Sequence, residues 1–79
     1  MTGMTMLAKL HTRVINILDA NRWAYEETVG DMIRFKVRVP LGDTSKNAVI
    51  NIWSTGTVQV QGQKDAAEVV RIALNKDGL

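Results

Sequence analysis

The chain of 79 residues lacks cysteine entirely and contains a single histidine, His11. Without cysteine, neither a disulfide nor a thiolate metal site can support the fold, and this composition is compatible with a reducing, intracellular compartment such as the cytoplasm or nucleoid. One histidine does not supply the ligand set of a transition-metal site. We therefore expect no metal and no other cofactor.

Long apolar segments are also missing. The apolar runs cover only a few residues, whereas a helix that spans a bilayer needs about 20, so we expect no membrane partner. The N-terminus has no basic region followed by an apolar stretch, so we expect no signal peptide. We expect one domain, residues 1–79, whose small core buries only about 60% of the surface that the unfolded chain exposes.

Motifs that carry catalysis are missing as well. The chain has neither a glycine-rich phosphate loop nor a nucleophile elbow, and its carboxylates show no spacing typical of an acid–base pair. His11 lies beside the apolar stripe of an expected helix, which favours a partly buried or surface histidine over a base. We expect a protein that is not an enzyme; a small nuclease or toxin-like enzyme using His11 is the least favoured alternative.

Two segments have helical periodicity. Apolar residues recur at spacings of three and four over residues 4–20 and 63–76, which places them on one side of each helix. Asn21 and Gly78 are the expected stops. The two stripes comprise Leu7, Leu10, Val14 and Leu18 in the first helix and Ala66, Val69, Val70, Ala73 and Leu74 in the second.

Four segments between these helices have the features of strands, namely residues 23–29, 32–39, 48–53 and 57–61. The clearest is 32–39, in which apolar and basic residues alternate without exception. Gly30 and Asp31 separate the first two strands, and residues 40–47 are expected to form a polar loop.

The turn between the last two strands predicts their register. Ser54, Thr55 and Gly56 fit a three-residue hairpin loop whose third residue is left-handed. Trp53 then faces Thr57, while Ile50, Ile52, Val58 and Val60 share the opposite side of the hairpin. Together these elements predict an α+β domain in the order helix, four-stranded antiparallel meander, helix, with two layers and both helices on one sheet face.

The uncovered face of this sheet is the candidate binding site. The net charge of +2 is only weakly basic, so the grouping of cations matters more than their number. Cations attract phosphates, amides can bond base edges and an indole offers a stacking surface. The alternative is that this face is an ordinary solvated sheet face with no binding role. The expected contact residues are Arg34, Lys36, Arg38, Asn51, Trp53, Thr57, Gln59 and Gln61.

Trp23 and Tyr25 have two possible positions. A two-residue turn at Gly30 and Asp31 would place both aromatic side chains on the basic face, whereas a loop one residue longer or shorter would turn them into the core. We favour the core, because Phe35 alone fills little volume beneath two helices.

Residues 48–70, AVINIWSTGTVQVQGQKDAAEVV, resemble the hairpin and helix of the TATA-box-binding-protein repeat. The N-terminal substrate-binding domain of one bacterial ribonuclease H class is similar. This resemblance implies a sheet face that binds nucleic acid at the minor groove or on a hybrid duplex, with Trp53 in the place of a wedging phenylalanine. The family has two repeats and this chain has one; a homodimer could rebuild the two-repeat saddle, but nothing in the sequence requires one.

Two classes of function are therefore carried forward. The first is a non-catalytic module that binds DNA or RNA with the uncovered face. The alternative is a protein-interaction or homodimerisation module that buries the same face or a sheet edge.

Overall fold

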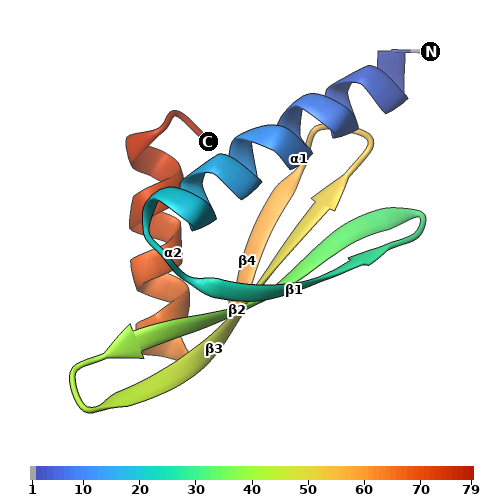
Figure 1. The fold of residues 1–79 in the computed structure, drawn as a ribbon. Helices are drawn as coiled ribbons and strands as arrows, with labels where there is room; N and C mark the ends of the chain where they lie inside the picture. Colours follow the sequence, from blue (N-terminus) through green and yellow to red (C-terminus); the bar gives the residue numbers. More distant parts are fainter. Residues whose placement is uncertain (1) are drawn as a thin grey trace.

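The computed structural model describes residues 2–79 as one α+β domain, as predicted. A long helix comes first, four antiparallel strands follow in the spatial order β1-β2-β3-β4, and a second helix ends the chain (Figure 1). The elements are α1 (Thr2–Ala20), β1 (Ala24–Val29), β2 (Met32–Leu41), β3 (Thr44–Trp53), β4 (Val58–Gly62) and α2 (Lys64–Lys76).

The core lies between the helices and one face of the sheet, because alternate strand residues point toward the helices. On β2 the buried residues are Ile33, Phe35, Val37 and Val39, and their neighbours in sequence are exposed. The apolar stripes of both helices join the same cluster, with Val14, Leu18 and Val70 fully buried. Both predicted layers and the predicted core are thus confirmed. Neither α1 nor α2, over the described residues, is long and apolar enough to cross a membrane.

The β2–β3 hairpin is longer than the sequence predicted. The expected loop over residues 40–47 is wrong, because both strands continue to a two-residue turn at Gly42 and Asp43, where Gly42 has a φ of 66°. Pro40 is tolerated in β2 because of its place in the ladder. Leu41 and Thr44 are the pair that flanks the turn, and Pro40 and Ser45 are the next pair. In a two-residue hairpin the flanking pair exchanges the hydrogen bonds, so the missing N–H of Pro40 breaks no ladder bond there.

The predicted β3–β4 hairpin is confirmed in turn and register. Asn51 lies opposite Gln59, and Ile50 lies opposite Val60. The Gly56 N–H donates to the carbonyl of Trp53 at 2.9 Å, and Gly56 has a φ of 94°, as a left-handed third loop residue requires.

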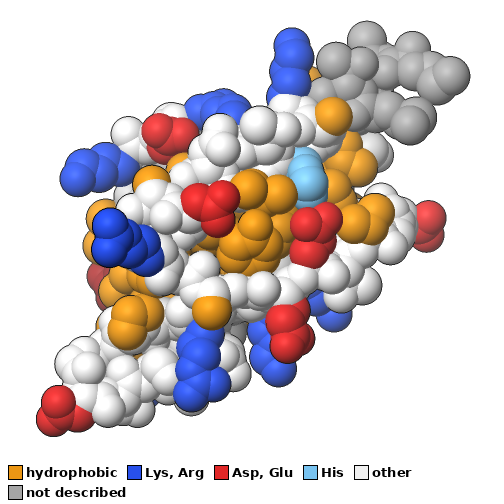
Figure 2. Space-filling model, viewed as in Figure 1, with side chains coloured by type: hydrophobic (Ala, Val, Ile, Leu, Met, Phe, Trp, Pro, Cys, Tyr) orange, Lys and Arg blue, Asp and Glu red, His pale blue; other side chains and the backbone are white. Residues whose placement is uncertain are grey.

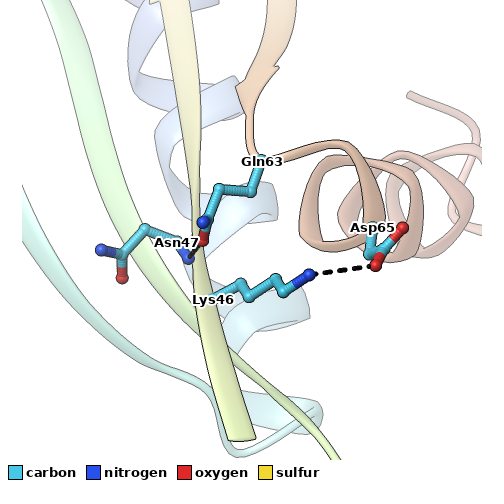
Figure 3. Close-up of polar contacts among 4 residues, drawn as sticks. All are labelled: Lys46, Asn47, Gln63 and Asp65. Atoms are coloured by element: carbon cyan, nitrogen blue, oxygen red, sulfur yellow. Dashed lines mark hydrogen bonds and ion pairs between the residues drawn. The ribbon is translucent and has the colours of Figure 1, made fainter.

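The passage from β4 into α2 is bound tightly to β3. Gln63 pairs twice with Asn47: its N–H donates to the Asn47 carbonyl at 3.1 Å, and its Oε1 accepts from the Asn47 N–H at 3.0 Å. The side chain of Lys46 extends from β3 toward α2, away from the side chain of Asn47, and its Nζ lies 3.2 Å from Oδ2 of Asp65 (Figure 3). Gly62 permits this close approach, because a Cβ there would lie 2.8 Å from the Asn47 carbonyl oxygen.

The two helix ends show one predicted and one unpredicted feature. Gly78 has a φ of 84°, and the N–H of Leu79 reaches the carbonyl of Leu74 at 2.9 Å, so α2 ends in a Schellman motif as its glycine predicted. At the end of α1, however, Arg22 and not Asn21 is left-handed, with a φ of 59°. The Asn21 side chain instead donates to the carbonyl of Ile17 at 2.8 Å.

Trp23 and Tyr25 belong to the core side of the sheet, as favoured. Val29 pairs with Ile33, so the β1–β2 connection is one residue longer than the two-residue alternative. Trp23 is only 9% exposed, and the ring of Tyr25 meets that of Phe35 edge to face at a centroid distance of 5.6 Å. Partial burial raises the pKa of the Tyr25 phenol, and the nearby carboxylates of Asp19 and Glu27 raise it further.

Candidate nucleic-acid interface

The sheet face away from the helices, called the free face below, is organised around β2. Arg34, Lys36 and Arg38 are all exposed and follow one another on alternate residues of this strand. Because β2 is an inner strand, the cation row runs along the middle of the sheet. The other free-face residues are Ala24, Glu26 and Thr28 from β1; Met32 and Pro40 from β2; Ser45, Asn47, Val49, Asn51 and Trp53 from β3; and Gln59, Gln61 and the preceding Thr57 at β4.

Register brings the predicted contact residues together on this face, but Asn51 is not accessible. It lies opposite Arg34, whose Nε donates to the Asn51 Oδ1 at 3.0 Å. Only 1% of Asn51 is exposed, although it is on the face that the helices leave uncovered. Directly opposed residues of an antiparallel pair are close enough for one long side chain to cover a short one. Asn51 therefore orients Arg34 and does not itself reach a ligand in this arrangement.

The second arginine is oriented in the same way. Arg38 donates through Nε to Ser45 Oγ at 2.9 Å. No hydrogen bond among the described residues uses the terminal guanidinium nitrogens of Arg34 or Arg38. Both guanidinium groups are thus held by one edge and keep the other for a bidentate contact with an anion such as phosphate.

A shallow hollow lies beside the cation row at the end nearer Arg38. It is lined by Ala24, Glu26, Lys36, Arg38 and Asn47, together with part of Tyr25. Glu26 pairs with Lys36 across the β1–β2 ladder, so the single acidic side chain of the described free face lies directly beside the middle of the row. The electrostatic surface is therefore asymmetric, with β1 acidic, β2 basic, and β3 and β4 neutral.

Trp53 lies at the other end of the row, half-buried, opposite Met32 and next to the start of β4. Val49, also half-buried, adds an apolar side chain between Lys36 and Gln61. The predicted contact residues did not include Met32, Ser45, Asn47 or Val49, although the predicted register already placed Val49 opposite Gln61. Alternation within β2 and β3 points to Met32 and Val49, whereas the wrong loop over residues 40–47 hid Ser45 and Asn47.

His11 does not take part in this face. It extends from α1 toward β1, where its Nε2 lies 2.8 Å from Oε2 of Glu27, and its ring stacks on Phe35 at a centroid distance of 5.6 Å. Figure 2 shows the histidine at the border of a hydrophobic area between α1 and β1. Among the residues that the structure describes, no three His, Asp or Glu side chains form a group that could hold a metal ion. These contacts give His11 a packing role between the helix and the sheet.

Comparison with protein-family models, with curated proteins and with solved structures found no match to this chain.

Proposed function

We propose that this protein is a non-catalytic nucleic-acid-binding module that uses the free face. The observation that carries the proposal is the row of three exposed cations on β2, with Trp53 on β3 beside one end of the row. Lys and Arg neutralise phosphates and release counterions, which supplies most of the affinity of a sequence-independent site. An aromatic side chain beside such a row offers a stacking surface to a base.

Several other features support this proposal. Arg34 and Arg38 are held through Nε, so less side-chain entropy is lost when each binds a phosphate. The resemblance of residues 48–70 to the TATA-box-binding-protein repeat predicts the same use of this face. The intracellular location expected from the absence of cysteine would give the protein access to nucleic acid. Gln59, Gln61 and Thr57 are exposed at β4, across β3 from the row, and are assigned contacts with bases or sugars.

The test is the salt dependence of binding. Each neutralised phosphate contributes about −0.7 to −0.9 to the slope of log K against log salt, so three contacts predict a slope of about −2 to −3. The triple variant Arg34→Gln, Lys36→Gln, Arg38→Gln should flatten that slope and keep the fold, because the three side chains lie outside the core. Loss of the hydrogen bond from Arg34 to Asn51 should lower the free energy of unfolding by about 1 kcal/mol. Binding is measured by fluorescence anisotropy with labelled DNA and RNA at several salt concentrations.

A matched control separates this row from net charge. Lys9, Lys64 and Lys76 are exposed on the helices, and their replacement by glutamine lowers the net charge by the same three units. This control should leave the salt slope within about 0.5 of the original value. Absence of binding to any nucleic acid at low salt, combined with a dimer in sedimentation and Trp53 shielded from quenchers, would replace the proposal with a homodimerisation module.

A further inference from the structure

The spacing of the cation row matches the repeat of an extended nucleic-acid backbone. The Cα atoms of alternate residues of a strand are about 6.7 Å apart, so those of Arg34 and Arg38 are separated by about 13 Å along β2. A nucleotide unit and a pair of amino-acid residues both contribute six backbone bonds, so their extended lengths are similar. A nucleic-acid strand pulled straight along β2 would therefore present one phosphate to each cation.

The free face offers cations to one backbone only. Within the part of the chain that the structure describes, β1, β3 and β4 carry no Lys or Arg on this side, and Lys46 points to the helix side, where it pairs with Asp65. A duplex presents a second row of phosphates across a groove about 6 or 12 Å wide. With strands about 4.8 Å apart, that row would lie between β3 and the far edge of β4, where the free face carries no cation, or on the β1 side, where Glu26 repels it.

The side chains that suit bases lie on the opposite side of the row from Glu26. Trp53 and Val49 provide apolar surface on β3, while Gln59 and Gln61 are exposed on β4. Bases have flat faces and stack on an indole with little regard to sequence. A strand that placed its phosphates over β2 would have to direct its bases across β3 and β4, away from the acidic β1.

Resting on the proposed function, we infer that the free face binds an extended single-stranded segment of about four nucleotides. Three phosphates, which join four nucleosides, lie on Arg34, Lys36 and Arg38. The bases extend over β3 and β4, and the base at one end stacks on Trp53. DNA and RNA share this chemistry of phosphate and base, and the duplex is the alternative that the geometry disfavours.

A length series tests the inference. Single-stranded DNA and RNA oligonucleotides of about two to eight nucleotides are titrated at low salt, alongside a duplex of matched sequence. Affinity should rise up to about four nucleotides and then stay nearly constant, and the duplex should bind at least about tenfold more weakly. A duplex that binds as tightly as the single strand would overturn this inference while leaving the proposed function intact. Absence of binding to every oligonucleotide would overturn the proposed function itself.

The position of the stacked base provides a second readout. The fluorescent base 2-aminopurine is placed at each position of the tetranucleotide in turn, and its quenching on binding is measured. Quenching should be strongest at one end, and Trp53→Ala should abolish that difference and weaken binding by about 5- to 150-fold. Trp53→Phe should keep most of the effect, because it keeps an aromatic face. Equal quenching at every position, or quenching that survives Trp53→Ala, would overturn the placement of the end base on Trp53.

A charge variant at Glu26 tests whether the bound strand runs beside the acidic side chain of β1. Glu26→Gln removes the negative charge beside Lys36 and should raise single-strand affinity about two- to threefold at low salt. The matched variant Glu68→Gln, on the exposed side of α2, makes the same change of net charge away from the face and should have little effect. If both variants raise the affinity equally, net charge sets the affinity, and the bound oligonucleotide does not run beside Glu26.

Discussion

The two faces of the sheet are built from the same strands, yet they differ in what a side chain contributes. On the helix-covered face, Phe35, Ile50 and Ile52 are fully buried, and their contribution is to the free energy of unfolding. On the free face, Lys36 and Gln61 are exposed, and their loss would leave the fold intact. Alternation along a strand thus separates stability from binding at neighbouring positions.

Asn51 interrupts this division, since it lies on the free face and is as buried as a core residue. Arg34 lies directly opposite and donates to the Asn51 amide oxygen, so its long side chain contributes to this burial. A long cation can therefore convert a free-face position into a packed one. The comparison of the two faces predicts four effects, taken from the largest to the smallest.

The largest effect is expected from truncation on the covered face. Ile50→Ala should lower the free energy of unfolding by about 2–5 kcal/mol, because it opens a cavity beneath both helices. Val49→Ala, one residue away on the free face, should cost less, since Val49 is already partly solvated. Denaturant unfolding measures both changes. An equal cost for the two variants would remove the distinction between the faces.

The next effect concerns the two left-handed glycines of β4 and its turn. Gly62→Ala brings a Cβ to 2.9 Å from the Cα of Ala48, so backbone must move, whereas Gly56→Ala meets only the flexible end of the Met6 side chain. Each variant should cost about 1–2 kcal/mol for its backbone conformation, with a further loss at Gly62. The melting temperatures of the two variants are compared. A larger fall for Gly56→Ala than for Gly62→Ala would contradict the prediction.

A smaller effect is expected from the buried amide of the free face. Asn51→Ala should lower the free energy of unfolding by about 1 kcal/mol, because it removes the hydrogen bond to Arg34. It should also weaken oligonucleotide binding without changing the salt slope, since the charge of Arg34 remains. The control is Gln59→Ala at the paired, exposed position, where stability should change by less than about 0.5 kcal/mol.

The smallest effect is a dependence of stability on alkaline pH. Since the pKa of Tyr25 is raised in the folded state above its usual value of about 10, its contribution to stability is complete below that pH. It is lost as the pH rises through the folded-state pKa. Tyr25→Phe should therefore make the stability less dependent on pH above about 10.

Two measurements check the Tyr25 prediction. Denaturant unfolding at several alkaline pH values compares the variant with the original chain. Because Tyr25 is the only tyrosine, phenolate absorbance follows this one group in the folded protein. Titration of the folded protein at or below the usual tyrosine value would contradict the assigned shift.

Local patterns in the sequence were sufficient for the element order, the cation row and the β3–β4 register. Alternation along residues 32–39 determines which side chains share a face, whatever the neighbouring strand contributes. The turn at Ser54, Thr55 and Gly56 determines a register because only certain backbone conformations close a three-residue hairpin. These features depend on residues that are close in sequence, so they could be predicted from it.

Only the tertiary structure decided the features that depend on a partner across the sheet. Pro40 reads as a loop residue, yet pairing with β3 places it where no N–H is needed. Trp23 and Tyr25 take their positions from the pairing of Val29 with Ile33, and Asn51 is buried by a residue 17 positions away. Each outcome depends on a contact between distant segments, which local propensity and periodicity do not encode.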